Sequence, residues 1–182
     1  MTMHNNSERY ATTLIALHWL ILAFVVATYA CIELRVLFPK GSDPREALKT
    51  WHFMLGLSVF LLAGIRVIVR IIGGPAPAIV PAPKSWQQTL AKVVHVALYA
   101  LILGMPLVGW LILSASGKPI PFFGLELPAL MTEDKVVASQ AKSIHEAAGT
   151  VGYFLIALHS AAALYHHYFV GDNTLLRMLP RK

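Results

Sequence analysis

The chain has 182 residues, of which 57% are hydrophobic and 13% are charged, and its mean hydropathy is +0.62. Soluble globular domains carry about 25% charged residues, so the composition argues against a soluble all-helical protein. The formal net charge of +6 would suit nucleic-acid binding, but the charges flank long apolar segments. We therefore expect a lipid bilayer, and no nucleic acid, as the partner.

Four uncharged runs account for the shortage of charge, at residues 10–32, 50–65, 93–117 and 147–171. Three of them exceed the ~20 residues that a helix needs to cross a bilayer, and the second reaches that length by including Arg66. We predict an all-α, integral membrane four-helix bundle that forms a single domain over residues 1–182. Its helices are expected at about 12–34, 46–72, 85–114 and 133–170.

The connections between these helices carry turn and start signals. Gly73-Gly74-Pro75 ends the second helix, and a proline-rich spacer follows it. Residues 115–132 form the longest non-helical stretch and are expected to lie on the outer membrane face. Thr132, followed by Glu133 and Asp134, predicts the start of the fourth helix, because its hydroxyl can cap N–H groups and the acids favour the positive end of the helix dipole.

Four spans place both termini on one side of the membrane. The predicted loops and ends on that side contain eight of the 15 Lys and Arg residues, and the opposite side contains seven. The positive-inside rule therefore favours cytoplasmic termini by a narrow margin.

Four histidines lie within the predicted spans at two depths. His18 is near the inner end of the first helix, and His52 is near the outer end of the second. In the fourth helix, His145 and His159 are separated by 14 residues, which is about four turns or ~21 Å with almost no rotation. This spacing predicts an inner pair, His18 with His159, and an outer pair, His52 with His145.

Two such pairs suit two haems, because neutral imidazole is a good axial ligand of haem iron. Two axial histidines leave no open iron position, which favours electron transfer over oxygen binding. Cys31 is the sole cysteine and no Cys-x-x-Cys-His motif is present, so the haems are expected to be of the non-covalent b type. A single buried histidine is more often a packing residue; four at matched depths favour haem.

Two alternatives to haem are a zinc or copper site and a transporter without haem. A zinc or copper site needs three or four ligands at one depth. His18, His95 and His159 would meet that need, but His52 and His145 would be left without a role. A haem-free transporter is disfavoured because the chain has no internal repeat and no interrupted helix pair.

Further polar residues are expected at the inner level. His95 and the neighbouring His166 and His167 either serve a quinone or snorkel to the interface, and Lys84 is another quinone candidate. Arg66 and Arg70 either neutralise haem propionates or snorkel.

Several motifs together resemble the bacterial cytochrome b561 family, over nearly the whole chain. They are Ala16-Leu17-His18-Trp19, Glu33-Leu34-Arg35, Phe38-Pro39, Trp51-His52, His145-Glu146, Gly152-Tyr153-Phe154, Leu158-His159, His166-His167-Tyr168-Phe169 and Asp172-Asn173-Thr174-Leu175-Leu176-Arg177-Met178. The resemblance implies a four-helix di-haem b protein of the bacterial inner membrane. By the positions of its motif, the iron ligands are His18, His52, His145 and His159.

The resemblance also implies an activity. It is strongest to stand-alone members that act as superoxide oxidases, which pass electrons from periplasmic superoxide to ubiquinone. No nucleophile or acid–base dyad is required, and outer-face cations would steer the anion: Arg35, Lys40, Arg45, Lys49 and Lys142. The alternative is a cytochrome b anchor and electron-relay subunit of a membrane dehydrogenase or hydrogenase.

Overall fold

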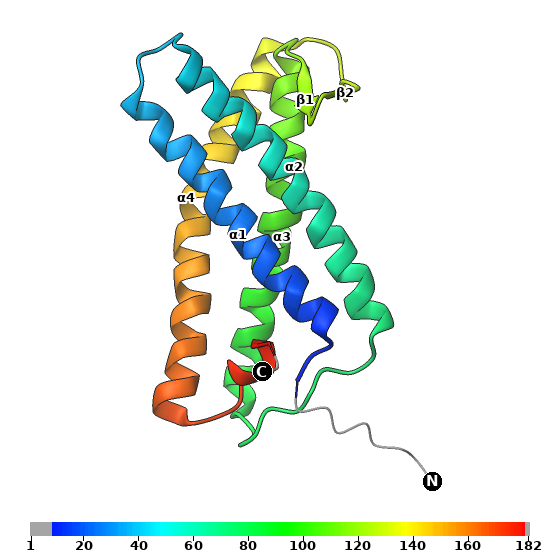
Figure 1. Ribbon diagram of the computed structural model, residues 1–182, viewed down its shortest axis with the longest axis vertical. Helices are drawn as coiled ribbons and strands as arrows, with labels where there is room; N and C mark the ends of the chain where they lie inside the picture. The colour runs from blue at the N-terminus through cyan, green and yellow to red at the C-terminus, as the bar shows by residue number, and fades with distance from the viewer. Residues whose placement is uncertain (1–8, 181–182) are drawn as a thin grey trace.

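Four long helices dominate the computed structural model, which describes residues 9–180 (Figure 1). His4, Arg181 and Lys182 lie outside these residues. The helices are α1 (Thr12–Leu34), α2 (Asp43–Ile72), α3 (Ser85–Ala115) and α4 (Lys135–Tyr165). They run alternately up and down. We call the end with the α1–α2 and α3–α4 connections the outer end, and the end where Arg9 meets Pro180 the inner end.

Each helix is long and apolar enough to cross a membrane. With their flanking turns, the four candidate spans have 26, 30, 31 and 36 residues, whereas about 20 suffice. Large apolar side chains cover their outward faces, among them Val26, Ile68, Val96 and Phe154, which are all more than half exposed. A surface of this kind is stable in hydrocarbon and not in water. The protein is therefore a multi-pass membrane protein.

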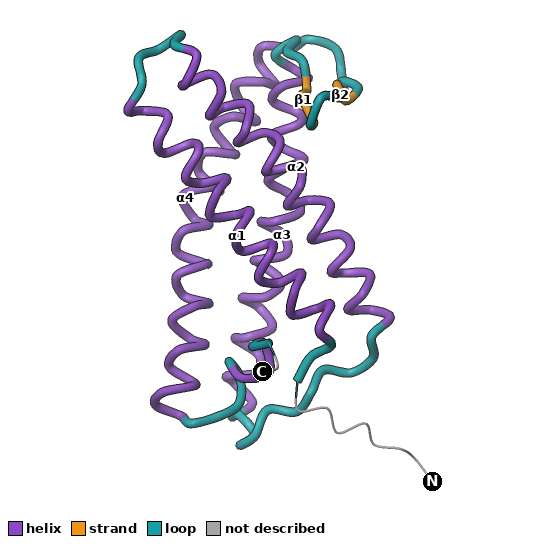
Figure 2. Tube along the Cα trace, viewed as in Figure 1, coloured by secondary structure: helices purple, strands orange, loops and turns teal. Residues whose placement is uncertain are grey.

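Short elements complete the chain (Figure 2). A 3-10 turn extends α1 (Arg35–Leu37), a π-helical turn extends α4 (His166–Val170), and a second 3-10 turn (Leu176–Met178) lies near the C-terminal end. Strands β1 (Ile120–Phe122) and β2 (Leu125–Leu127) pair antiparallel, with Ile120 opposite Leu127.

Consecutive helices pack along one another: α1 on α2, α2 on α3 and α3 on α4. Two small clusters of buried residues hold them together. Ile21, Val59 and Ala63 form the first, between α1 and α2, with α3 packed against it. Leu57 and Leu113 meet Ile120 of the hairpin in the second, at the outer end. Ile120 is only 2% exposed, so the hairpin closes the core at that end.

α1 and α4 are joined by side chains that bridge them. The Tyr29 hydroxyl donates a hydrogen bond to the Gly149 carbonyl over 2.9 Å, and the Tyr153 hydroxyl donates to Glu33 Oε1 over 2.9 Å. Gly152 is buried at this crossing, and a Cβ there would overlap the Tyr29 hydroxyl and lie 3.0 Å from Leu101 Cδ2. The absence of a side chain at Gly152 therefore allows Tyr29 to reach the backbone of α4.

Two details of the helix starts and one loop differ from the sequence-based expectation. The N-cap of α4 is Asp134 and not Thr132: its carboxylate accepts hydrogen bonds from the N–H groups of Val136 (2.9 Å) and Val137 (3.1 Å). α2 begins at Asp43, three residues before position 46, with Pro44 in its first turn, where proline's missing N–H costs nothing. Residues 115–132, predicted to be non-helical, contain the β1–β2 hairpin, which has no regular pattern in the sequence.

We expect Gly152→Ala to lower the free energy of unfolding by about 1–3 kcal/mol, because the added methyl group overpacks the α1–α4 crossing. Thermal unfolding of the detergent-solubilised protein measures the loss. Tyr29→Phe removes the hydroxyl that the methyl group meets, so the double variant should lose less than the sum of the two single losses. Strictly additive losses, or a Gly152→Ala variant as stable as the wild type, would contradict this account of the crossing.

Candidate functional site

Two pairs of histidines face each other across the bundle. His18 of α1 lies opposite His159 of α4, with ring centroids 6.3 Å apart and ring planes at 69°. His52 of α2 lies opposite His145 of α4, at 6.2 Å and 74°. These are the pairings that the depth argument anticipates, and all four residues are partly buried. We call them the inner pair and the outer pair.

The outer pair is oriented by its surroundings. His52 Nδ1 lies 2.9 Å from the Thr28 carbonyl oxygen. Because a carbonyl can only accept a hydrogen bond, Nδ1 carries the proton, and the lone pair of Nε2 is free for a metal. His145 lies against Gly109 of α3, where a Cβ would come 3.5 Å from its Cε1 atom. Glycine at 109 thus leaves room for the imidazole ring.

A third imidazole and one guanidinium group accompany the inner pair. The His95 ring lies 5.3 Å from that of His159, and its Nδ1 is 2.6 Å from the carbonyl of Ala91, one turn earlier in α3. Arg66 is within electrostatic reach of His18 and His159. Its Nη1 makes a long hydrogen bond to the Tyr99 hydroxyl (3.4 Å), and its buried Nε has no partner in residues 9–180. Arg66 therefore contributes positive charge to the field at the inner pair and keeps a free hydrogen-bond donor.

Arg70 and Lys84 are not brought to the inner pair. Arg70 lies one turn beyond Arg66, donates to the Gly74 carbonyl over 2.6 Å, and lines a pocket that contains none of the four paired histidines. Lys84 is exposed at the start of α3, and its backbone N–H donates to Gln87 Oε1 over 2.8 Å. Eleven residues of helix separate it from His95, which corresponds to ~16 Å along the axis.

His166 is held by the buried carboxylate of Asp172, a contact that the sequence does not predict. After the π-helical turn, Gly171 adopts a left-handed conformation (φ 72°) and reverses the chain. Asp172 thereby returns to His166, with its Oδ2 2.5 Å from Nδ1, and its side chain is only 1% exposed. The sequence does contain one indication of this contact. Gly171, a residue type that tolerates positive φ, directly precedes Asp172, which follows His166 by six residues.

The Asp172 carboxylate is stabilised in its charged form. Burial by itself would raise its pKa, but hydrogen bonds from His166 and from the Thr174 N–H (2.8 Å) outweigh burial and hold the pKa of Asp172 below its usual value. This ion thus anchors the C-terminal segment, residues 172–180, to the end of α4.

Clustered metal ligands are absent over the described part of the chain. No group of three or more His, Cys, Asp or Glu residues there is arranged to hold a metal ion.

Comparison with known proteins decides the family. The model of the prokaryotic cytochrome b561 family matches residues 9–181. The chain belongs to that family. Cytochrome b561 homolog 1 of Escherichia coli (strain K12) is 42% identical over 175 residues, which cover 96% of this chain and 99% of the relative. The probable superoxide oxidase CybB of Yersinia pestis is 36% identical (96% and 98%), and Cytochrome b561 homolog 2 of Escherichia coli (strain K12) is 31% identical (98% and 95%).

The expected resemblance and the four-helix membrane fold are thus confirmed. Membership makes this protein a membrane-bound redox protein that uses b-type haem and transfers electrons. All three relatives match this chain over nearly their full length.

For this cytochrome b561 family member we expect Asp172→Asn to lower the free energy of unfolding by about 1–3 kcal/mol at neutral pH, because a charge-assisted hydrogen-bond acceptor is lost. The folded-state pKa of Asp172 lies below the unfolded value. Its contribution is therefore complete above about pH 4 and is lost as the pH falls through the folded pKa. Thermal unfolding at pH 7 and below pH 4 should show the wild type and the variant converging.

The exposed Glu126 of β2 provides the matched control, since Glu126→Gln removes a carboxylate that makes no such contacts. A stability difference for Asp172→Asn that is absent at pH 7, or that stays constant with pH, would contradict the proposed anchor.

Proposed function

We propose that this protein is a di-haem electron-transfer protein in which His18 and His159 hold one haem and His52 and His145 hold the other. The observation that carries the proposal is the spacing within each pair. If two imidazoles held one metal ion through bonds of about 2.0–2.1 Å, and each ring centre lay ~1.1 Å from its bonding nitrogen, the two ring centres would be about 6.3 Å apart. The pairs lie at 6.3 Å and 6.2 Å.

The surroundings of the pairs also suit haem. Nε2 of His52 is left free by the Nδ1 bond to Thr28, and glycines lie beside or one turn from His145, at 109 and 149. At the inner pair, the buried Nε of Arg66 can donate to a propionate carboxylate. Arg70, which donates to Gly74, is the weaker of the two predicted propionate partners. A haem held by each histidine pair would supply one-electron redox chemistry.

The proposed reaction is the oxidation of superoxide with reduction of ubiquinone. Two superoxide ions give one electron each, and one quinone takes up both electrons and two protons, so that two dioxygen molecules and one quinol result. The name of the Yersinia pestis relative, a probable superoxide oxidase, supports this choice. We place the protein in the bacterial inner membrane with cytoplasmic termini, so that superoxide arrives from the periplasm at the outer end.

Cations at the outer end would attract the superoxide anion. Among the five predicted residues, Lys49 is paired with Glu46 (2.6 Å) and Lys142 with Glu146 (3.7 Å), which reduces their long-range field. Arg35 and Arg45 donate only to backbone carbonyls, and Lys40 has no described carboxylate partner. The attraction therefore rests mainly on Arg35, Lys40 and Arg45.

Quinone would bind at the inner level. His95 is the best-placed candidate, because its ring is next to His159 and its bonded Nδ1 leaves Nε2 free to accept or pass on a proton. His166 is the second candidate, since Asp172 fixes its ring. Lys84 lies farther from the inner pair and remains a predicted quinone-binding residue. These side chains would hold the quinone oxygens and relay two protons from the cytoplasm.

A relay subunit of a membrane dehydrogenase is the alternative, and the hairpin at the outer end is the observation that favours it. Hydrogen bonds from Trp110 Nε1 to the Pro128 carbonyl (3.0 Å) and from the Leu130 N–H to Ser114 Oγ (3.0 Å) fix this segment on the bundle. Phe123 and Leu125 are exposed on it and offer an apolar contact to a partner. Co-purification of a stable partner enzyme would favour this function.

We expect each of the variants His18→Ala, His52→Ala, His145→Ala and His159→Ala to lose one haem of two, because the iron loses an axial ligand. Pyridine haemochrome assay and reduced-minus-oxidised spectra measure the loss. His95→Ala is the matched control: its ring is as close to His159 as that of a ligand, yet both haems should remain while quinone reduction slows. A ligand variant that keeps two haems with unaltered spectra would refute the pairing.

Superoxide should reduce the haems within a stopped-flow mixing experiment, at a rate that falls with salt. Arg35→Gln combined with Lys40→Gln should slow this reduction by roughly tenfold at low ionic strength, because two steering charges are removed. Lys92→Gln, which removes a charge near the inner end, serves as the control. Haems that stay oxidised after mixing would exclude superoxide as the donor.

A further inference from the structure

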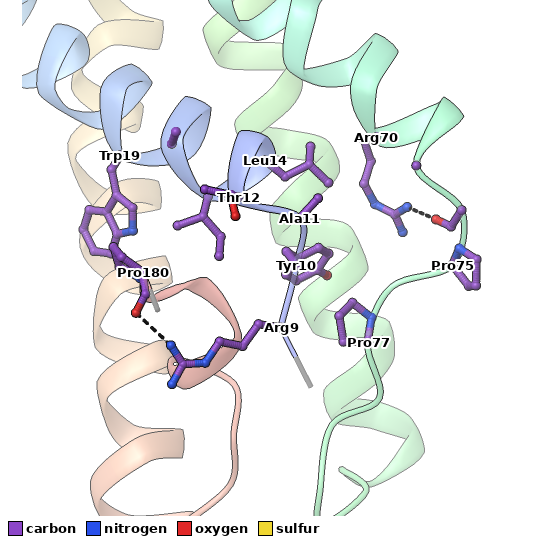
Figure 3. A pocket seen from close by; sticks show the side chains of 14 residues that line it. Arg9, Tyr10, Ala11, Thr12, Leu14, Trp19, Arg70, Pro75, Pro77 and Pro180 are labelled. Atoms are coloured by element: carbon purple, nitrogen blue, oxygen red, sulfur yellow. Dashed lines mark hydrogen bonds between the residues drawn. The ribbon is translucent and has the colours of Figure 1, made fainter. Parts of the chain in front are cut away.

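A pocket of about 680 Å³ lies at the inner end, apart from both histidine pairs (Figure 3). Three separate parts of the chain form it: the residues around the start of α1, the turn after α2, and Pro180 near the C-terminal end. Buried Leu14 and Ile15 and the indole of Trp19 make one wall apolar. Arg9 and Arg70 line the pocket from different elements, so it combines an apolar wall with two cationic groups.

Within residues 9–180, the arginines in this pocket are hydrogen-bonded to uncharged groups. Arg9 Nη1 donates to the carbonyls of Pro180 (2.7 Å) and Leu179 (3.3 Å), and Arg70 Nη1 donates to that of Gly74 (2.6 Å). These acceptors carry no net charge, and no Asp or Glu among residues 9–180 lines the pocket. Each guanidinium keeps further N–H donors for a ligand.

A third guanidinium group lies behind the pocket. Arg177 is 8% exposed, lies 5.5 Å from the centre of the Tyr10 ring, and donates to the carbonyl of Pro77. Tyr10 and Pro77 both line the pocket. α1 adds to the positive field, because its N-cap, Ala11, has no capping side chain and its first turn contains no acid.

We propose that this pocket binds the headgroup of an anionic phospholipid. The headgroup would accept hydrogen bonds from Arg9, in the segment before α1, or from Arg70, in the last turn of α2, which line opposite sides of the pocket (Figure 3). Basic pockets between helix ends at a membrane surface suit such headgroups, and tryptophan is typical of that depth. Ile71 and Ile72, each more than three-quarters exposed at the end of α2, are placed to contact acyl chains.

The apolar wall is the reason for choosing a lipid over free phosphate. An inorganic anion would contact the arginines alone and leave Leu14, Ile15 and Trp19 without a ligand. A lipid would contact both the arginines and the apolar wall of the pocket. This site is independent of the proposed electron transfer, because none of its lining residues is a paired histidine.

The test measures lipid binding to the full-length, haem-loaded protein. Native mass spectrometry of delipidated protein, titrated with phosphatidylglycerol, should show one lipid bound in preference to phosphatidylcholine. Arg9→Gln combined with Arg70→Gln should weaken this binding about tenfold or more, as expected for the loss of charge-assisted hydrogen bonds. Arg45→Gln is the matched control: Arg45 also donates to two carbonyls, but at the outer end, and its variant should bind phosphatidylglycerol like the wild type.

Several results would overturn the proposal. They are equal binding of the two lipids, wild-type affinity in the double variant, or stabilisation by inorganic phosphate at the same concentration and to the same degree as by phosphatidylglycerol. A visible spectrum with both Soret and α bands confirms that each variant is folded. If the double variant loses its haem, Arg70→Gln alone carries the test. An Arg70→Gln variant with unchanged lipid affinity but a shifted haem reduction potential would assign Arg70 to a propionate and refute the lipid site.

Discussion

The four-turn separation of His145 and His159 is the constraint on which the rest of the bundle depends. Both residues project from one face of α4, so this helix sets the two depths, and the other helices supply a partner at each. α1 meets the inner depth with His18 near its start, and α2 meets the outer depth with His52 near its own start. In an up-and-down bundle, α1 begins at the inner end and α2 begins at the outer end, so this topology is the simplest one that places their histidines at the two depths.

Small residues and tyrosines keep α4 in register with this arrangement. Gly109 of α3 makes room for His145, and Gly152 of α4 makes room for Tyr29. Tyr29 then reaches the Gly149 carbonyl and fixes α1 against α4 between the two depths. The described core contains few buried side chains, because most of each helix surface faces lipid. The packing of the helices is thus defined by specific side-chain hydrogen bonds and close contacts, because the bundle has no broad apolar core to define it.

The spans and the depths of the histidines could be predicted from the sequence, because both follow from counting residues along helices. Contacts that depend on a change of chain direction could not. Arg66 and Arg70 occupy equivalent faces one turn apart, yet only Arg66 stays near the inner pair, because α2 ends and the Gly74 carbonyl captures Arg70. The hairpin depends on positive φ at Phe123 and Gly124, and the His166–Asp172 contact depends on the reversal at Gly171. Contacts between loops leave no periodic pattern in the sequence, so the sequence could not predict them.

The C-terminal segment connects parts of the molecule that are far apart in the chain. Asn173 is hydrogen-bonded to Ala78 and Val80 of the α2–α3 connection, and the carbonyl of Met178 accepts a hydrogen bond from Trp19 Nε1 over 2.7 Å. Trp19 is the immediate neighbour of His18, whose ring lies 5.4 Å from the indole. A fluorescent protein or purification tag added at the C-terminus therefore needs a linker long enough to leave the Trp19–Met178 hydrogen bond intact.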